Sequence, residues 1–363
     1  MNKERFGEIW IVFGMQFGSE GKGAITEYLS PAVSAGVRIG AANAGHTIYY
    51  HDERFIMRQL PSVWINPHAQ LIIGINALLD VSLLFQEVTA IEKFLPVVHR
   101  LRIDYRAHVI TEEQKRVEQD SDLAVRISST SAQSGEGIGR AAADKVLRKE
   151  SCVLARDVAE LQPYLCDTTD VINTLLEDDC IVLVEGTQGF GLSLDHGYFP
   201  YVTSRDTTVA ALAAGIGVGL HEFPVRAIGV VRTYPIRVAG QSGPFGPDSQ
   251  ELTWEDVTAQ ADAPHLLTER TSVTNRVRRV ATFSNEGIVR ATRINRPTEL
   301  AVTFADYLDW GMHESDILTK PVEDFIDRLE QLTQVQVMLV KTGPRTTVDF
   351  EPYRLNMLRR LRR

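Results

Sequence analysis

The stretch Glu8-Ile9-Trp10-Ile11-Val12-Phe13-Gly14-Met15-Gln16-Phe17-Gly18-Ser19-Glu20-Gly21-Lys22-Gly23 decides the fold of this chain. Its first part is a short apolar run rich in β-branched and aromatic residues, which predicts a strand buried on both faces. Its second part is a glycine-rich turn, and the helical pattern that follows from Ala24 stops before Pro31. The sequence therefore predicts a strand, a glycine-rich loop and a helix in direct succession.

The glycine-rich loop is a candidate phosphate site. Its backbone N–H groups can point inward around phosphate oxygens, the helix start adds its positive end, and Lys22 can lie against the β- or γ-phosphate. The spacing differs from the Walker pattern, because the glycine before Gly21 is Gly18, and Gly23 stands where a Mg²⁺-binding Ser or Thr is expected. The alternative is a tight strand-to-helix turn without a ligand, but the lysine in this context favours phosphate binding.

The rest of the chain alternates between the same two kinds of element. Further short apolar runs predict strands at 70–74, 181–184, 225–231 and 335–340, and amphipathic patterns predict helices at 77–93, 139–149, 170–178, 207–216 and 321–332. Strands that alternate with helices predict an α/β fold in which helices cover both faces of a mostly parallel central sheet. We therefore expect a single large P-loop-like domain over residues 1–363, with elaborate loop insertions at about 41–60 and 232–298.

The composition narrows the class of protein. The 363 residues include 38 Lys and Arg against 47 Asp and Glu, and the net charge of −9 argues against a surface built to hold nucleic acid. No window approaches the ~20 uninterrupted apolar residues of a membrane span, and the three cysteines lack the paired spacing of a metal site. We therefore expect a cytoplasmic enzyme that has neither a nucleic acid nor a membrane as its partner.

Two further motifs combine glycine with polar side chains. In Asn43-Ala44-Gly45-His46-Thr47, His46 is a candidate acid or phosphate contact, although a lone histidine is more often structural. The string Glu185-Gly186-Thr187-Gln188-Gly189 comes directly after the strand predicted at 181–184. Because ligands of parallel sheets bind beyond the carboxyl ends of strands, we expect Gln188 to face a substrate.

A cluster of arginines lies late in the chain, within Thr271-Ser272-Val273-Thr274-Asn275-Arg276-Val277-Arg278-Arg279, just after Arg270. Alternating arginines on a threonine-rich loop of an acidic protein suit bidentate capture of a carboxylate or a phosphate. A solvated basic face is an equally open explanation from composition alone.

Together these motifs resemble the adenylosuccinate synthetase family along nearly the whole chain. The strings that carry the resemblance occur in the family's order: Gly18-Ser19-Glu20-Gly21-Lys22-Gly23, Asn43-Ala44-Gly45-His46-Thr47, Glu185-Gly186-Thr187-Gln188-Gly189, Asp195-His196-Gly197, Pro200-Tyr201-Val202-Thr203-Ser204 and Thr342-Gly343-Pro344. The resemblance implies a ligase that uses Mg²⁺. In this family a nucleoside triphosphate passes its γ-phosphoryl group to O6 of a purine monophosphate, and the amine of L-aspartate then attacks C6 and expels phosphate. Catalysis of the first step is chiefly positioning and charge neutralisation.

The resemblance also implies which residues contact each substrate. The nucleoside triphosphate would be held by Gly21, Lys22, Gly23, Ala24, Gly45, His46, Thr47, Phe304, Asp306 and Gly343. The purine monophosphate would be held by Ser19, Asn43, Gln188, Thr203, either Thr130 or Ser134, and Arg148 from the second subunit of a homodimer. L-Aspartate would be held by Thr274, Arg276 and Arg278, with Arg279 close by. The implied catalytic residues are Ser19, Lys22, His46 and Gln188, and the implied Mg²⁺ ligands are Ser19 and the Gly45 carbonyl.

One residue departs from the family pattern. Ser19 stands where most members have an aspartate that serves as the general base for the purine N1 proton and as a Mg²⁺ ligand. A serine hydroxyl cannot act as a base unaided, so the proton acceptor (Ser19 itself, Glu20 or a water) is left open. A guanine base carries an exocyclic amine beside N1, and a shorter neutral side chain gives this amine both room and an acceptor.

With a serine at position 19, the chain resembles the phage branch of the family. This branch makes N6-succino-2-amino-2′-deoxyadenylate from dGMP and aspartate, on the route to 2-aminoadenine in DNA. On this interpretation the enzyme works in the cytoplasm of an infected host. Two alternatives stay open. One is an adenylosuccinate synthetase that acts on IMP with GTP, and the other is a non-catalytic nucleotide-binding protein that kept the pocket.

The triphosphate site departs from the family as well. The family's guanine-reading string has a lysine two positions before an aspartate, whereas Val302-Thr303-Phe304-Ala305-Asp306 keeps the aspartate and has Phe304 in place of the lysine. An aromatic ring stacks on either purine, which weakens the preference for guanine. We therefore expect ATP or dATP, while the carboxylate of Asp306, which suits guanine N1 and N2, keeps GTP open.

Overall fold

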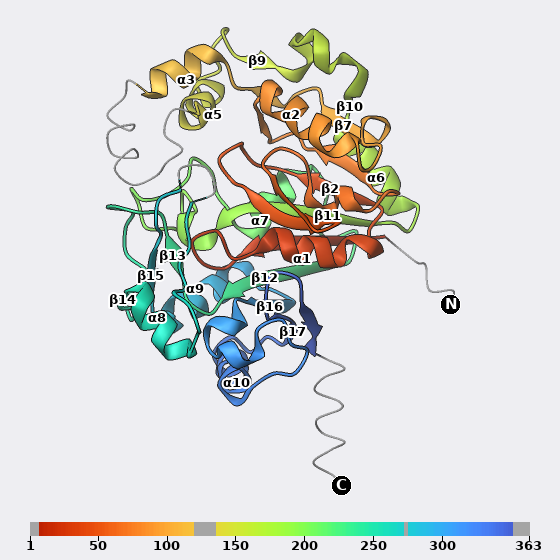
Figure 1. Cartoon of the computed structure of the whole chain (residues 1–363). Helices are drawn as coiled ribbons and strands as arrows, with labels where there is room; N and C mark the ends of the chain where they lie inside the picture. Colours follow the sequence, from red (N-terminus) through yellow and green to blue (C-terminus); the bar gives the residue numbers. More distant parts are fainter. Residues whose placement is uncertain (1–6, 120–135, 272–274, 351–363) are drawn as a thin grey trace.

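The predicted succession of strand, glycine-rich loop and helix lies at the centre of the fold. Strand β1 (Glu8–Gly14) is in the middle of the main sheet, and helix α1 (Lys22–Leu29) begins directly after the loop (Figure 1). The computed structural model describes residues 7–119, 136–271 and 275–350. Within these residues the predicted α/β class and the mostly parallel central sheet are confirmed.

The main sheet has ten strands in the order β10-β7-β5-β2-β11-β1-β12-β16-β17-β18, and only the pair β17–β18 is antiparallel. Its other strands are β2 (Ala35–Arg38), β5 (Gln70–Ile73), β7 (Leu101–Asp104), β10 (Leu165–Cys166), β11 (Ile181–Gly189), β12 (Val225–Arg232), β16 (Glu299–Thr303), β17 (Val337–Lys341) and β18 (Thr347–Asp349). In the register of the sheet, Ile11 of β1 lies opposite Val184 and Ala227. After β1, the chain first forms the strands on one side of it, up to β11, and then the strands on its other side, beginning with β12. The carboxyl end of β1 is therefore a topological switch point, where open α/β sheets bind ligands.

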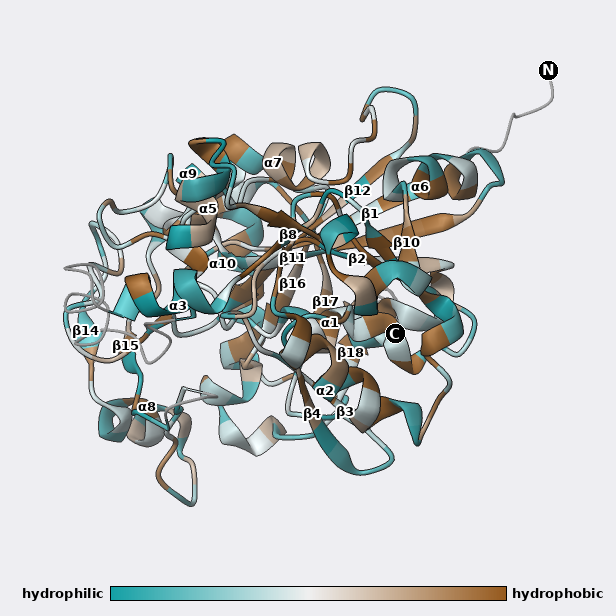
Figure 2. Cartoon of the chain, turned by 90° about the horizontal axis from the view of Figure 1, so that it is seen from above, coloured by the Kyte–Doolittle hydropathy of each residue, from teal (hydrophilic) through white to brown (hydrophobic). Residues whose placement is uncertain are grey.

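Side chains alternate along β1 between two apolar layers. Ile9, Ile11 and Phe13 belong to the layer on one face of the sheet, while Trp10 and Val12 belong to the layer on the other face. The first layer is completed by α6 (Thr168–Glu177), α7 (Val209–Ala214), α9 (Asn285–Asn295) and α10 (Lys320–Thr333), and the second by α1 and α2 (Val81–Glu92). Figure 2 shows the apolar strands in the interior, between the helices of the two layers. Burial on both faces explains why the strand sequence is apolar without interruption.

Smaller elements lie outside the main sheet and contribute to the wall of the site. The segment 41–60 contains the hairpin β3 (His46–Tyr50) and β4 (Glu53–Met57). The segment 232–298 contains a three-stranded sheet of β13 (Ile236–Arg237), β15 (Arg279–Ala281) and β14 (Glu251–Leu252), together with α8 (Trp254–Ala261) and α9. A third small sheet joins β6 (Leu78–Leu79), β8 (His108–Val109) and β9 (Val153–Leu154), near α3 (Glu112–Gln119) and α5 (Ile138–Val146).

The structure differs from the sequence prediction where elements are short. Strands β2, β7 and β16 have only four or five residues each, and no apolar run marked them in the sequence. The helix predicted at 77–93 begins at Val81, because Asp80 accepts a hydrogen bond from the backbone N–H of Leu83 and caps it. Among the helices that the structure describes, none combines the length and the apolar character needed to cross a bilayer.

Candidate active site

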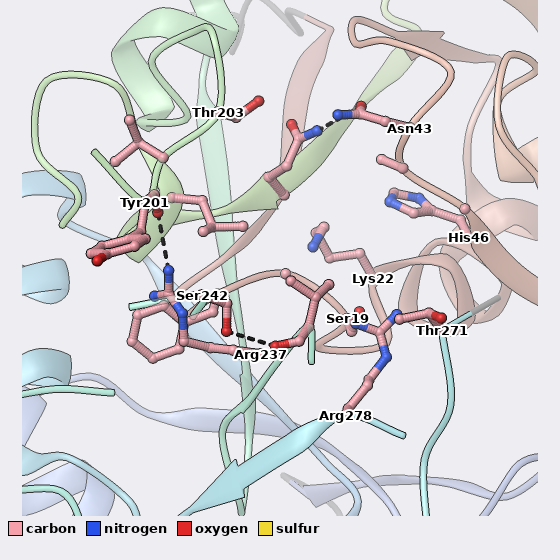
Figure 3. Close-up of a pocket in the computed structure, with 18 of the residues that line it drawn as sticks. Ser19, Lys22, Asn43, His46, Tyr201, Thr203, Arg237, Ser242, Thr271 and Arg278 are labelled. Atoms are coloured by element: carbon pink, nitrogen blue, oxygen red, sulfur yellow. Dashed lines mark hydrogen bonds between the residues drawn. The ribbon is translucent and has the colours of Figure 1, made fainter. Parts of the chain in front are cut away.

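A cavity of about 610 Å³ opens at the carboxyl edge of the main sheet (Figure 3). Its walls come from segments that are far apart in the sequence, namely 17–23, 43–47, 199–204 and 237–242, together with Gln188 at the end of β11. Twelve of the residues singled out in the sequence line it: Ser19, Gly21, Lys22, Gly23, Asn43, Gly45, His46, Thr47, Gln188, Thr203, Arg278 and Phe304. Ala24, Arg148, Arg276, Arg279, Asp306 and Gly343 do not line it, and Thr130, Ser134 and Thr274 lie outside the described residues.

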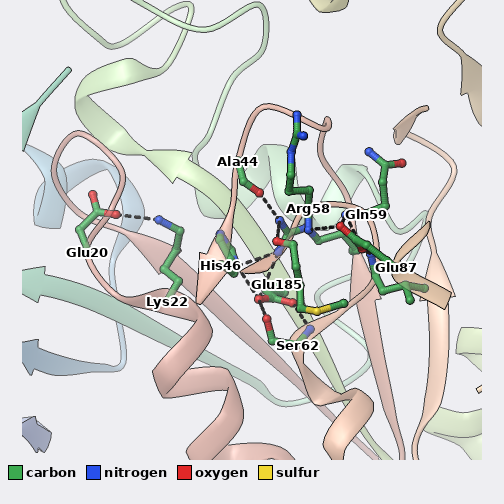
Figure 4. Close-up of polar contacts among 12 residues, drawn as sticks. Glu20, Lys22, Ala44, His46, Arg58, Gln59, Ser62, Glu87 and Glu185 are labelled. Atoms are coloured by element: carbon green, nitrogen blue, oxygen red, sulfur yellow. Dashed lines mark hydrogen bonds and ion pairs between the residues drawn. The ribbon is translucent and has the colours of Figure 1, made fainter. Parts of the chain in front are cut away.

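The glycine-rich loop is held in one shape by the carboxylate of Glu20. This carboxylate is fully buried, accepts hydrogen bonds from the backbone N–H groups of Gln16 (3.1 Å) and Gly18 (2.7 Å), and pairs with Lys22 at 2.7 Å (Figure 4). The loop takes left-handed backbone angles at Gly18 (φ 83°), Ser19 (φ 55°) and Gly21 (φ 82°). Glu20 does not line the cavity, so its carboxylate is not placed to accept a proton from a bound purine.

The side chain of Ser19 is exposed to the cavity, although its backbone is fixed. Its carbonyl accepts a hydrogen bond of 2.9 Å from Arg232, while its hydroxyl has no partner among the described residues. The cavity-lining carboxylates of the described part of the chain are those of Glu118 and Glu269. Glu118 accepts from the backbone N–H of Gly139, and Glu269 pairs with Arg232. No carboxylate in this wall, as far as the structure describes it, therefore substitutes directly for the aspartate that the family pattern has at position 19.

His46 belongs to a buried polar cluster beneath the cavity (Figure 4). Its Nδ1 contacts both the Glu185 carboxylate and the Arg38 guanidinium, the latter at 2.6 Å, and the backbone and hydroxyl of Ser62 also donate to Glu185. Burial, together with the charge of Arg38, lowers the pKa of His46 to about 4. Burial alone raises the pKa of Glu185, but the charges of Arg38 and His46 and the hydrogen bonds outweigh it and lower this pKa to about 2.

The protonation of this cluster determines what His46 presents to the cavity. Nδ1 faces both the Glu185 carboxylate, which can only accept, and the Arg38 guanidinium, which can only donate. Nε2 has no partner among the described residues and is directed to the cavity side of the ring. A phosphoryl group bound against Nε2 favours the protonated ring, so His46 becomes a donor when anionic substrate is present.

Gln188 and Asn43 form a polar pair in the cavity wall, where Asn43 lies on the same segment as His46 (Figure 3). The side-chain amide of Gln188 donates to the Asn43 carbonyl oxygen at 3.0 Å, and Gln188 has a left-handed backbone angle (φ 58°) at the end of β11. Its own side-chain oxygen is buried without a hydrogen-bond partner in the described part of the chain. A buried orphan acceptor that lines a cavity suits a ligand with an N–H donor, such as a purine ring.

The arginines of the late cluster separate into different environments. Arg278 lines the cavity, has no ion pair among the described residues, and has its pKa lowered by burial and by nearby Arg232. Arg276 is exposed outside the cavity. Arg279 instead pairs with Glu251 at 2.7 Å. Arg270 also lines the cavity and donates to the Asn275 carbonyl at 2.8 Å, so Arg270 and Arg278 are the members of this cluster whose charge is available to a bound anion.

Arg237 was not singled out in the sequence, yet it lines the cavity. The residue is 3% exposed, and its guanidinium donates to the carbonyls of Tyr201 (3.0 Å) and Pro244 (3.2 Å) and lies over the ring of Phe17, 4.5 Å from its centroid (Figure 3). Burial, aided by the charge of Arg279, lowers its pKa to about 9. The available sequence signal was a charged residue inside an apolar run that directly follows the strand at 225–231.

The predicted triphosphate residues late in the chain form a second group beside the loop. Phe304 has a left-handed backbone angle (φ 55°) and lies against the guanidinium of Arg232, 3.9 Å from the ring centroid. Asp306 is buried, which raises its pKa, and its carboxylate accepts from Nδ1 of His313 at 2.7 Å. Asp306 is thus already engaged by a histidine.

The parallel sheet, the glycine-rich loop at its switch point and the arginine-lined cavity are typical of an α/β nucleotide-binding enzyme. The family model described as adenylosuccinate synthetase matches residues 11–158 and 152–317, and the chain belongs to this family. It is therefore a carbon–nitrogen ligase of the adenylosuccinate synthetase type, which favours an enzyme over a non-catalytic nucleotide-binding protein.

Individual proteins support the same assignment. The adenylosuccinate synthetase of Pyrococcus horikoshii is 39% identical over 345 residues, which cover 92% of this chain and 95% of that protein. The structure of cyanophage S-2L succinoaminodeoxyadenylate synthetase, bound to dGMP and dATP as an energy donor, is 28% identical with a TM-score of 0.79, covering 95% of this chain and 96% of that chain. The adenylosuccinate synthetase of Plasmodium falciparum is 19% identical with a TM-score of 0.79 (94% and 99% coverage), and supports the fold alone.

The depressed pKa of His46 predicts a specific pH dependence of stability. A histidine in the unfolded chain titrates near 6.5, whereas His46 in the folded chain titrates near 4, so between these values the unfolded chain binds an extra proton. The free energy of unfolding therefore rises with pH across this window. We expect His46→Asn to flatten that rise between about pH 5 and 6.5, measured by chemical denaturation.

The matched control for this experiment is His68→Asn, because His68 is exposed. Its slope should equal that of the natural protein. The contribution of Glu185 is lost only below its unfolded value of 4.5, so it does not disturb the window. An unchanged slope in His46→Asn would mean that the imidazole titrates like a solvated one.

Proposed function

We propose that this ligase joins L-aspartate to C6 of dGMP at the expense of ATP or dATP, and releases N6-succino-2-amino-2′-deoxyadenylate for 2-aminoadenine DNA synthesis. The observation that carries the proposal is the small, neutral side chain of Ser19, exposed in the cavity at the position where the family pattern has an aspartate. Its hydroxyl has no partner among the described residues and can accept from an exocyclic amine.

The geometry around Ser19 supports guanine over hypoxanthine as the acceptor base. The two bases differ at C2, where guanine adds an amine with two donors. A serine is shorter than an aspartate, so it leaves space for this amine, and a site built to hydrogen-bond a substrate group discriminates strongly against an analogue that lacks it. The cyanophage synthetase adds support, because its structure holds dGMP and dATP and it aligns over 95% of this chain.

The remaining cavity residues fit the two chemical steps. Lys22 neutralises charge on the transferring phosphoryl group, and His46 donates to it once its Nε2 is protonated. Gln188 and Asn43 hold the purine, whose N1 proton leaves to solvent or through Ser19, because Glu20 is buried in its ion pair with Lys22. The phosphoryl group on O6 then departs as phosphate when the aspartate amine attacks C6.

A divalent cation fits this site through the substrates' phosphates. The protein oxygens at hand are the Gly45 carbonyl and the Ser19 hydroxyl, and Mg²⁺ characteristically takes few protein ligands beside phosphate oxygens and water. When bound, Mg²⁺ would neutralise phosphate charge during phosphoryl transfer. Among the described residues no cluster of three or more His, Cys, Asp or Glu side chains is arranged for a metal ion.

The alternative substrate is IMP, with GTP as the donor. It is favoured by overall identity, since the archaeal relative that is 39% identical over 92% of this chain is an adenylosuccinate synthetase. On identity alone this alternative has better support than dGMP. The two candidates make opposite demands on position 19, so one substitution separates them.

Substrate choice should follow the side chain at position 19. We expect the natural enzyme to release phosphate with dGMP and aspartate at least about tenfold faster, in kcat/KM, than with IMP. Ser19→Asp should reduce kcat/KM for dGMP by roughly tenfold to a hundredfold, the range expected when a polar contact to substrate is lost and a charge crowds the amine.

The control is Ser19→Gly, which keeps the space for the amine and loses only the acceptor, so dGMP should still be used, at a reduced rate. Glycine also accepts the left-handed angle of this position. Consumption of IMP but not dGMP by the natural protein would overturn the proposed substrate and establish the alternative.

The triphosphate site supports adenine over guanine. Phe304 offers a ring that stacks on either purine, but the carboxylate of Asp306 is engaged by His313. We expect ATP and dATP to outcompete GTP in a phosphate-release assay. His313→Ala frees Asp306 to accept from guanine N1 and N2. The ratio of kcat/KM for GTP to that for ATP should then rise by about fivefold to tenfold, the effect expected of one hydrogen bond. Equal use of all three donors by both proteins would contradict this assignment.

The two neighbouring arginines provide a paired test of aspartate binding. Arg278 faces the cavity without an ion pair among the described residues, whereas Arg279 is paired with Glu251. We expect Arg278→Met to raise the KM for aspartate by roughly tenfold to a hundredfold, because a charge-assisted contact to a carboxylate is lost. Arg279→Met should change this KM by less than about threefold. The reverse order of the two effects, in initial-rate kinetics, would assign the carboxylate to Arg279.

We also propose that the enzyme is a homodimer in which Arg148 reaches the monophosphate of the neighbouring subunit. Arg148 is exposed, has a left-handed backbone angle (φ 53°) and does not line its own cavity. Its neighbours Val146 and Leu147 are 77% and 64% exposed. An exposed apolar pair beside a cation suits a contact with a second copy of the chain.

A further inference from the structure

Arg232, at the end of β12, is fully buried and makes contacts in several directions at once. Its Nε donates to the Tyr234 carbonyl at 2.6 Å, and one Nη donates to the Ser19 carbonyl at 2.9 Å. Both Nη atoms contact the carboxylate of Glu269, and the guanidinium carbon Cζ lies over the ring of Phe304, 3.9 Å from its centroid. A single side chain thus connects three segments that are far apart in the sequence.

Each of these segments carries a different part of the proposed chemistry. Ser19 faces the purine acceptor, and Phe304 faces the base of the triphosphate. Glu269 begins the segment that leads to Arg278, and its carbonyl accepts the backbone N–H of Arg278 at 2.8 Å. Arg232 itself does not line the cavity, so it acts on the substrates only through these neighbours.

The backbone at two of these contacts needs external support. Ser19 and Phe304 both have φ of 55°, a left-handed conformation that is unfavourable for residues other than glycine. The hydrogen bond to the Ser19 carbonyl and the stack on Phe304 favour these conformations. Arg232 is itself fixed by Gln16, whose side chain accepts from its backbone N–H (2.9 Å) and donates to its carbonyl (3.1 Å).

We propose that Arg232 is a positioning residue. It fixes the relative positions of three segments, namely those of Ser19 (purine), Phe304 (triphosphate) and Glu269 (aspartate). The inference rests on the proposed assignment of these segments to the three substrates. A guanidinium is required, because the three N–H donors of a lysine ammonium share one nitrogen and cannot reach the acceptors that Nε, Nη1 and Nη2 of Arg232 reach separately.

The test compares Arg232→Lys with Arg226→Lys. Arg226 lies at the other end of the same strand, pairs with Glu299 and stacks on Trp10 at 4.5 Å, so it makes the same kinds of contact away from the cavity. We expect Arg232→Lys to raise the KM values for the purine monophosphate, the triphosphate and aspartate together, each by about tenfold, from the loss of charge-assisted hydrogen bonds. Arg226→Lys should leave all three KM values within about twofold of the natural enzyme, whatever either substitution does to the melting temperature.

A second variant covers the case in which Arg232→Lys does not fold. Glu269→Gln leaves the contacts of Arg232 with Ser19 and Phe304 in place but weakens its hold on the aspartate segment. It should therefore raise the KM for aspartate about tenfold and leave both nucleotide KM values within about twofold. The inference is overturned if Arg232→Lys changes no KM more than Arg226→Lys does, or if Glu269→Gln shifts all three KM values equally.

The assay uses whichever purine monophosphate the natural enzyme consumes. If this is IMP, the proposed substrate fails while the comparison of Arg232→Lys with Arg226→Lys proceeds unchanged. The two ideas therefore fail through different observations.

Discussion

The buried carboxylate of Glu20 is the constraint on which the rest of the site depends. It joins the backbone of the glycine-rich loop to Lys22, the first residue of α1, with no exposure to solvent. Removal of one partner from a buried ion pair leaves an unpaired charge at a cost of roughly 3–5 kcal/mol. The loop consequently has one favourable shape, and the elements that surround it are positioned against a rigid reference.

Charge is distributed around the cavity in a way that suits anionic ligands in an acidic protein. The buried cations Lys22, Arg38 and Arg232 each have a carboxylate partner. Arg54, Arg237, Arg270 and Arg278 line the cavity without an ion pair in the described residues. The net charge of −9 belongs to the chain as a whole, while the local field of the cavity is set by these four guanidinium groups and by Lys22.

The sequence predicted the core of the fold because β1 and the first four residues of β11 are apolar runs. It missed β2 and β16, since small or polar residues interrupt the apolar pattern in both strands, whereas β5 and β17, which are as short, were predicted from their apolar runs. The site was predictable where glycine-rich strings follow strands. The place of Arg237 in the cavity and the ion pair between Arg232 and Glu269 were not predictable. Both depend on contacts between segments that are distant in the sequence, and local residue spacing does not indicate such contacts.

The loop separates two properties of position 19 that are usually linked. The main chain of Ser19 is part of the scaffold, held by Arg232, whereas its side chain meets only the contents of the cavity. An exchange there can therefore alter ligand selectivity with little penalty for folding, provided the newcomer tolerates a left-handed backbone. The left-handed backbone restricts the residues accepted at this position largely to glycine and small polar residues, above all asparagine and aspartate. A scaffold of this kind lets one side chain of the cavity wall change while the loop that carries it keeps its shape.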